Sequence, residues 1–177
     1  FLVQNGLRLL GLYPPARDYV AQMKFKPSPR FVSGFLLPDG RSARTTLVGR
    51  LFPQPDVLLD DDSAVALDDV LGQGFAVVMR GVPDDADMLG LSEIDWGGIR
   101  PNGVIIAPRD DSAPAPEGII VVRESEAQDW PGVPVGHVFL LRPDRYVAAC
   151  LPLEQWHRRR ADIVSLIAAT FDRGSEE

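Results

Sequence analysis

The sequence predicts an α/β domain in which a mixed β-sheet is flanked by helices and preceded by an extended N-terminal arm. Short, continuously apolar runs, typical of strands buried on both faces, alternate with segments that carry helix-capping residues. Near the C-terminus, two strand-like runs flank a turn, which indicates an antiparallel hairpin. The length of 177 residues suits one domain with an arm, so no second globular unit is expected.

The arm is predicted from composition. Residues 1–12 are rich in apolar side chains, but Gly6 and Gly11 interrupt any helical pattern, and Pro14 and Pro15 stop it. An apolar segment of this kind is expected to pack on another surface. Residues 24–45 are rich in proline and polar groups, with turn chemistry at residues 38–40, and we interpret them as a linker or wrapping arm.

In the first half of the domain, proline and glycine residues mark where the predicted elements end. A strand is expected over residues 45–52, ending at Pro53. Residues 60–63 are expected to cap a helix that runs through Leu71 and is terminated by Gly72 and Gly74. A buried strand over residues 75–79 and a short helix from Pro83 toward Leu89 follow.

The second half is predicted to be mostly strands. Residues 103–107 and 118–122 are β-type runs separated by a proline-bearing, acidic loop. Residues 137–141 and 146–150 flank the turn at 142–145 and form the clearest hairpin in the chain. A final helix after Pro152 is predicted from an apolar stripe that ends before Gly174 and consists of Trp156, Ile163, Ile167 and Phe171.

Three blocks of sequence carry a family resemblance. They are Val48-Gly-Arg-Leu-Phe-Pro-Gln-Pro55, Leu67-Asp-Asp-Val-Leu-Gly-Gln-Gly-Phe-Ala-Val-Val78 and Leu140-Leu-Arg-Pro-Asp-Arg-Tyr-Val-Ala-Ala149. In this order and spacing, the chain resembles the C-terminal, thioredoxin-like domain of FAD-dependent aromatic-ring hydroxylases of the phenol 2-monooxygenase-like family. The stretch Met23-Lys-Phe-Lys-Pro-Ser-Pro-Arg-Phe31 narrows the resemblance to the branch that includes 3-(3-hydroxyphenyl)propionate hydroxylase.

The resemblance implies a division of labour within a larger protein. Such enzymes use FAD, NAD(P)H and dioxygen to insert one oxygen atom into a phenolic ring, with the catalytic and flavin-binding residues in preceding domains. It implies that residues 1–44 are the end of the catalytic region and a linker arm, and that residues 45–177 are the C-terminal domain. This domain would pack against the FAD-binding catalytic domain of the same protein and contribute to a homodimer. Candidate interface residues are Arg50, Pro53, Gln54 and Pro55.

No catalytic, cofactor-binding or metal-binding residue is assigned within the chain. Cys150 stands alone at the end of an apolar run, so we expect a buried, inert thiol rather than redox chemistry. The glycines at 72 and 74 precede a strand and lack the third glycine of a dinucleotide-binding turn. His137 and His157 lack the companions of a metal site, and the acidic runs near residues 60 and 84 lack the continuation of an EF-hand loop.

Charge and hydropathy limit the partners further. The net charge of −7 argues against nucleic acid, and no apolar run approaches a membrane span. A single cysteine fits a cytoplasmic location. The chain begins with Phe1 and has no signal-peptide pattern, which suggests a processed or excised piece. Two alternatives remain open: a free-standing thioredoxin-fold module that binds another protein without redox activity, and a thiol peroxidase acting through Cys150.

Overall fold

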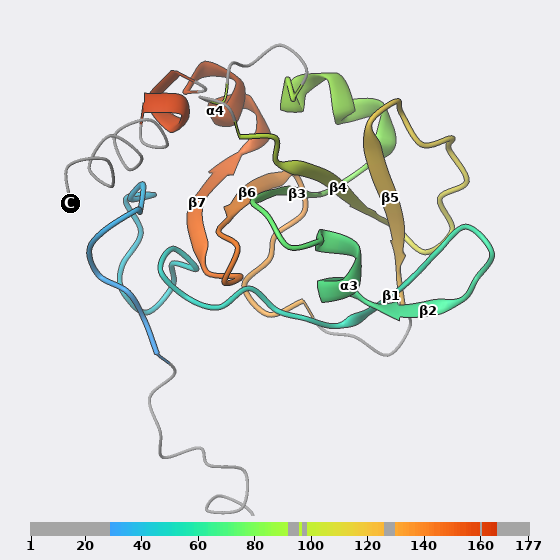
Figure 1. Cartoon of the computed structure of the whole chain (residues 1–177), viewed down its shortest axis with the longest axis horizontal. Helices are drawn as coiled ribbons and strands as arrows, with labels where there is room; N and C mark the ends of the chain where they lie inside the picture. Colours follow the sequence, from blue (N-terminus) through green and yellow to red (C-terminus); the bar gives the residue numbers. More distant parts are fainter. Residues whose placement is uncertain (1–28, 92–95, 97–98, 126–129, 160, 166–177) are drawn as a thin grey trace, which may run out of the picture.

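A mixed β-sheet forms the centre of the molecule (Figure 1). The computed structural model describes residues 29–91, 96, 99–125, 130–159 and 161–165. Within these residues, seven strands pair in the order β2-β1-β5-β4-β3-β6-β7. The strands are β1 (Asp56–Leu58), β2 (Ala64–Ala66), β3 (Ala76–Arg80), β4 (Asn102–Ala107), β5 (Ile119–Glu124), β6 (His137–Leu141) and β7 (Val147–Pro152).

The central strands confirm the predicted thioredoxin-like plan. Strand β3 runs parallel to β4, with Val78 opposite Val104, and antiparallel to β6, with Val78 opposite Phe139. Strands β6 and β7 form the predicted antiparallel hairpin. Strand β5 lies parallel to β4 on its other side, and the predicted loop of residues 108–117 connects the two. The apolar runs at 75–79, 103–107, 118–122 and 137–141 are therefore strands, with bounds shifted by at most two residues.

Helices cover both faces of the sheet, which explains the continuous apolar runs. Along β3, Ala76 and Val78 join the cluster beneath α3 (Leu67–Leu71), whereas Val77 and Met79 join the cluster on the opposite face. That opposite face is covered by the 3₁₀ helix η1 (Pro83–Leu89) and by α4 (Leu153–Arg158), which lie side by side in Figure 1. Because alternate residues of a strand point to opposite faces, both sets must be apolar.

The two helices on that face are joined by one buried polar contact. The Trp156 indole Nε1 donates to the Leu89 carbonyl oxygen at 3.1 Å. The predicted helix from Pro83 to Leu89 is present as a 3₁₀ helix, and Gly90 ends it in the left-handed conformation. The final helix is confirmed for its first part, where Trp156 and Ile163 are buried as expected. Ile167, Phe171 and Gly174 lie outside the described residues, as do residues 1–12.

The strand predicted over residues 45–52 is wrong. Residues 48–50 form a turn in which Gly49 has a φ of 79°, and only Leu51 makes a β-bridge, with Tyr146. A positive φ is incompatible with extended backbone and suits glycine, which has no Cβ. The alternating apolar residues of this segment reflect a turn packed on the hairpin rather than a strand within the sheet.

The capping role predicted for residues 60–63 is also wrong. These residues form the turn between β1 and β2, two short strands that the sequence analysis did not predict. The Asp61 carboxylate accepts hydrogen bonds from the backbone and the hydroxyl of Ser63, an arrangement that stabilises turns as readily as helix starts. Helix α3 starts only at Leu67, without a side-chain cap, and ends at Gly72 as predicted.

The described part of the arm lies along β7, at one edge of the sheet. The backbone N–H of Leu37 donates to the carbonyl of Ala148 at 2.7 Å, and the Phe35 ring contacts the Phe75 ring at 5.5 Å between centroids. An uncovered edge strand exposes unpaired backbone groups that can pair with other chains. The arm and the turn after it cover these groups along β7.

Candidate domain interface

The first and third sequence blocks run beside one another in space. The N–H of Gly49 donates to the carbonyl of Val147 at 2.8 Å, and the N–H of Val147 donates to the carbonyl of Arg50 at 2.9 Å. The N–H of Phe52 donates to the carbonyl of Arg145, also at 2.9 Å. The segment after the arm is thus hydrogen-bonded to the start of β7 over several residues.

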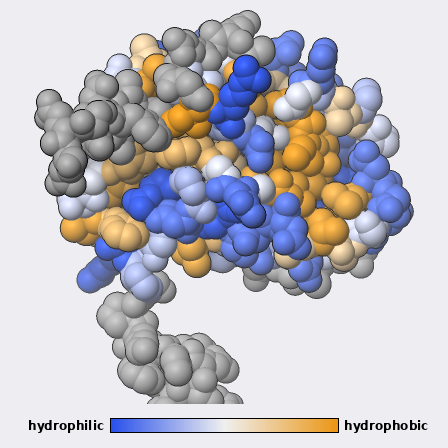
Figure 2. Space-filling model, viewed as in Figure 1, coloured by the Kyte–Doolittle hydropathy of each residue, from blue (hydrophilic) through white to orange (hydrophobic). Residues whose placement is uncertain are grey.

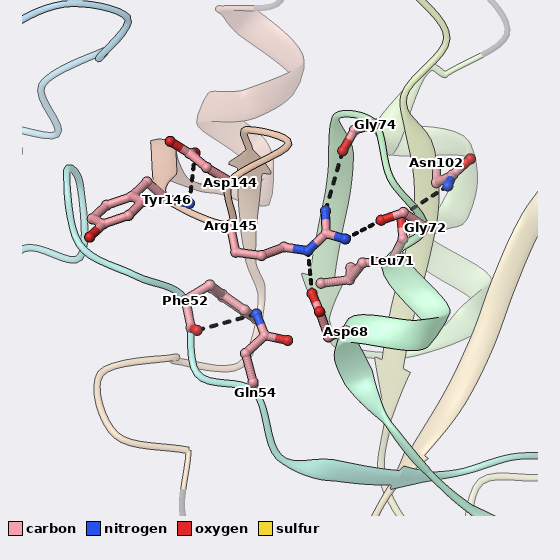
Figure 3. A network of polar contacts seen from close by, with 10 residues as sticks. All are labelled: Phe52, Gln54, Asp68, Leu71, Gly72, Gly74, Asn102, Asp144, Arg145 and Tyr146. Carbon is pink, nitrogen blue, oxygen red and sulfur yellow. Dashed lines mark hydrogen bonds and ion pairs between the residues drawn. The ribbon is translucent and has the colours of Figure 1, made fainter.

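Arg145 connects this pair to the second block (Figure 3). Its guanidinium forms an ion pair with Asp68 on α3 and donates to the carbonyl oxygens of Gly72 and Gly74 in the turn after that helix. The side chain of Arg145 is only 12% exposed. Asn102 reaches the same turn from β4, where its amide donates to the Leu71 carbonyl at 2.9 Å. The three blocks therefore form one spatial unit, which we call the motif junction.

The fork shape of the guanidinium explains why an arginine occupies this position. Its planar array of donors can serve a carboxylate and nearby carbonyls together, which a lysine ammonium does less well. The carbonyls at the end of a helix have no partner within the helix and need an external donor. Arg145 also has a φ of 67°, an uncommon conformation for a residue with a Cβ. The sequence analysis placed Arg145 in the hairpin turn but missed this role.

The predicted interface residues differ in how far they reach solvent. Gln54 is exposed, and its side-chain amide donates to the Phe52 carbonyl at 3.3 Å. Pro55 is buried and Pro53 is half-buried. Arg50 is half-buried, donates from Nη2 to the Ala43 carbonyl at 2.9 Å, and has a buried Nε without a partner. Arg50 is part of the turn at 48–50 and the other three residues follow it, so none of them ends a strand, and among the four only Gln54 is exposed.

Exposed apolar side chains lie beside the motif junction. Phe31, Val32 and Leu51 are all exposed, and we call them the apolar patch. The Phe31 ring packs edge-on against the Tyr146 ring at 4.7 Å, and Leu51 is bridged to Tyr146 through the backbone. Figure 3 shows the ring of Tyr146 pointing away from the guanidinium of Arg145. The sequence analysis missed the patch because its members become neighbours only through the fold.

A shallow depression of about 400 Å³ lies on the molecule near β3 and is lined by Arg41, Thr45, Arg80, Trp130, Gly132, Val133 and Pro134. Arg80 uses its donors internally, to Glu124 at 2.6 Å and to the Val133 carbonyl at 2.8 Å, and its guanidinium lies over the Trp130 ring. The depression is therefore stabilised by contacts of the domain with itself.

The cysteine of the chain lies in the apolar core. Cys150 is buried, as predicted, and its burial raises the pKa of the thiol to about 12, so almost no thiolate forms at neutral pH. Redox-active cysteine pairs lie at helix starts. The turn from β3 into η1 instead carries Gly81, Val82 and Pro83. Within the described residues, no group of three His, Cys, Asp or Glu side chains lies close enough to hold a metal ion.

Burial, the main influence, and the nearby charge of Arg41 lower the pKa of His137, despite an opposing hydrogen bond to the Val135 carbonyl. The neutral ring accepts a hydrogen bond from Arg41 at 3.0 Å, which ties the arm to β6.

In the part of the chain described by the structure, no helix is long and apolar enough to span a membrane.

Comparisons with known proteins agree with the sequence motifs. A family model described as the HcaD C-terminal domain matches residues 49–165. A 3-(3-hydroxy-phenyl)propionate/3-hydroxycinnamic acid hydroxylase from Klebsiella pneumoniae subsp. pneumoniae is 32% identical over 156 residues, which are 83% of this chain and 27% of the relative. The hydroxylase of the same description from Escherichia coli (strain K12) is 29% identical over 146 residues, 80% of this chain and 26% of the relative.

Among solved structures, the flavin-dependent monooxygenase PieE in complex with FAD and substrate is similar with a TM-score of 0.48 and 17% identity, over 80% of this chain and 24% of that protein. The chain spans about a quarter of the length of the curated relatives it matches. The family model covers most of the described sheet and all three sequence blocks except the first residue of the first one. The chain belongs to the HcaD C-terminal domain family.

Proposed function

We propose that this chain is the non-catalytic C-terminal domain of a flavoprotein monooxygenase that hydroxylates a phenolic aromatic acid with FAD, NAD(P)H and O2. Its role is assembly and stability, and its partner is the FAD-binding catalytic domain of the same polypeptide. One observation carries the proposal: the chain belongs to a C-terminal domain family and matches about a quarter of the length of hydroxylases.

The motif junction supports a structural role for the three blocks of this sequence. Arg145 directs its donors to Asp68, Gly72 and Gly74, all within the domain. Catalysis needs polar groups that face a substrate, whereas these groups bind one another. The raised pKa of Cys150 supports the same reading, because a thiol that stays protonated is a poor nucleophile.

The contact with the catalytic domain is proposed to include the segment of Arg50, Pro53, Gln54 and Pro55. Gln54 supports this best because it is exposed, whereas Pro55 would act by shaping the backbone. A homodimer of the longer protein and a cytoplasmic location, which the single cysteine favours, belong to the same proposal.

Two purified proteins test the proposed function. In the longer protein, deletion of residues 45–177 is expected to leave FAD bound at the catalytic region but to lower the thermal unfolding midpoint, because a packed domain has been removed. The measurements are the flavin absorbance per protein and calorimetry. Stoichiometric FAD on the separately purified 177-residue chain, or oxidation of NAD(P)H by that chain alone, would contradict the proposal.

A further inference from the structure

We propose that the apolar patch of Phe31, Val32 and Leu51 is the surface on which the preceding catalytic region of the same polypeptide docks. This inference rests on the proposed function and adds to it the docking residues, which differ from those expected from the sequence. The patch is contributed by the described start of the arm and by the turn that follows it.

The exposure of the patch is the first argument. Val32 is 81% exposed, Leu51 54% and Phe31 42%. Single exposed apolar residues are common on proteins and need no explanation, but several exposed apolar residues close together mark an interaction surface more often. Phe31 and Leu51 are linked through Tyr146, by a ring contact and by a β-bridge respectively.

Backbone and ring contacts hold the base of the patch in place. The N–H of Phe31 donates to the Gly49 carbonyl at 2.8 Å, and a Cβ at position 49 would overlap the Phe31 carbonyl oxygen. The Arg142 guanidinium lies over the Phe31 ring, 4.9 Å from its centroid, and forms a cation–π contact with it. A surface that is already ordered loses little conformational entropy when a partner binds, so such patches are efficient docking sites.

The catalytic region that precedes the domain is the partner expected at the patch. Phe31 and Val32 come before every described strand and helix, so the polypeptide that precedes the domain is joined to it on the side of the patch. The relatives are about four times as long as the segment they share with this chain. Because the preceding region belongs to the same polypeptide, its binding to the patch is intramolecular and benefits from a raised effective concentration.

Other exposed apolar side chains lack this connection. Figure 2 shows apolar residues gathered over the side of the molecule where β5 lies, and Ile120 on β5 is 42% exposed. Val135 is 65% exposed and lies just before β6. Neither residue lies near the arm that leads into the domain in sequence, so neither is assigned to the docking surface. Both provide matched controls.

The chemistry of the docking face on the catalytic region follows from the surroundings of the patch. Arg142 lies against Phe31, and Arg30 precedes it, with its Nε donating to the Val48 carbonyl at 3.3 Å. Arg142 is also ion-paired with Asp144 at 2.6 Å, so its charge is balanced within the domain. The partner face is therefore expected to be apolar at its centre, with a polar rim.

Cysteine labelling in the full-length protein tests the surface directly. Val32→Cys, Leu51→Cys and the control Val135→Cys are each labelled with a maleimide, and modification at the introduced residue is quantified by mass spectrometry. Cys150 gives little background because it is buried and stays protonated. A free surface predicts that Val32→Cys reacts at least as fast as Val135→Cys, following their exposure. Docking predicts that positions 32 and 51 react about tenfold or more slowly than position 135.

A second variant keeps the test decisive. Adding Val32→Asp to Leu51→Cys is expected to bring the labelling rate at position 51 up to that of Val135→Cys, because a buried unpaired carboxylate disrupts docking. Adding Val135→Asp is expected to change nothing. Labelling rates at 32 and 51 equal to that at 135 would overturn the docking surface. Protection that disappears on dilution to the monomer would assign the patch to a second copy and would also overturn it.

The flavin content of the same samples distinguishes a failure of the proposed function from a failure of the docking surface. A full-length protein without bound FAD contradicts the proposed function, whatever the labelling rates are. A flavin-loaded protein in which positions 32 and 51 are freely labelled retains the proposed function and rejects only the docking surface.

Discussion

The two edges of the sheet differ in how their backbone groups are covered. At the β7 edge, the arm and the turn at residues 48–50 supply hydrogen bonds to the strand, and the motif junction holds them there. At the other edge, β2 has only three residues and is followed directly by α3. Short edge strands offer little template for another chain, so this edge needs no cover.

The comparison shows that covering an edge also creates a surface. The arm places Phe31 against Tyr146, which also bridges Leu51, whereas the β2 edge ends in an exposed polar turn held by Arg123. Arg123 donates to the Leu59 carbonyl and to the Asp62 carboxylate, both at 2.7–2.8 Å. An arginine therefore fastens each edge, but only Arg145 connects distant segments of the family motif. Substitutions on the two edges can separate these roles.

The largest effect is expected from Gly49→Ala. Its φ of 79° disfavours any side chain, and the added Cβ would collide with the Phe31 carbonyl, so the arm would have to move. We expect a loss of about 3 kcal/mol in the free energy of unfolding, of which ~1–2 kcal/mol is backbone strain. Gly118→Ala is the matched control, because it has a φ of 75° and nothing within 4 Å of the added Cβ.

Urea unfolding of the two glycine variants measures the difference. Gly118→Ala should show only the strain, about 1–2 kcal/mol. Equal losses for the two variants would mean that the contact between Phe31 and Gly49 does not restrain the arm.

An intermediate effect is expected from Arg145→Ala. Removing the guanidinium leaves the Gly72 carbonyl and the Asp68 carboxylate without their partner, which should cost about 2–3 kcal/mol. Arg123→Ala, at the opposite edge, should cost only about 1 kcal/mol, because Asp62 is largely exposed. Chemical denaturation compares the two variants, and a larger loss for Arg123→Ala would reverse the roles assigned to the edges.

The smallest effect is a dependence on pH at His137 on β6, the strand next to the β7 edge. Because the pKa of His137 is lowered from its ordinary value of 6.5, the unfolded chain binds more protons than the folded one just below that pH. This residue's contribution to stability is therefore full above pH 6.5 and decreases as the pH falls through that value toward the folded pKa. In His137→Gln, the loss of unfolding free energy between pH 8 and pH 5.5 should be smaller than in the parent, as measured by urea unfolding. An unchanged difference between the two pH values would show that the titration of His137 is not coupled to folding.

How far the sequence predicted the structure depended on the range of the interactions. The runs at 75–79 and 103–107 were recognised because strands buried on both faces must be apolar throughout, whatever surrounds them. Gly72 was recognised as a helix end because a left-handed residue there favours glycine. The turn at Gly49 was mistaken for a strand because its apolar neighbours pack on a hairpin that lies almost a hundred residues later.

The candidate site shows the same division. Arg50, Pro53, Gln54 and Pro55 were chosen because they were expected at the end of a strand, but that strand is absent, and tertiary packing buries Pro55 and leaves Leu51 exposed. No local pattern indicates which of these side chains faces solvent, because a turn has no fixed periodicity.

By itself, the sequence determined the class of the fold, the central strands, the hairpin and the family, because these follow from local periodicity, turn chemistry and motif order. Only the tertiary structure decided that the three blocks meet at Arg145 and that Phe31 and Leu51 meet at Tyr146. The physical reason is that hydrogen bonds and ring contacts between segments far apart in the chain depend on how the whole sheet closes, which no short stretch of residues encodes.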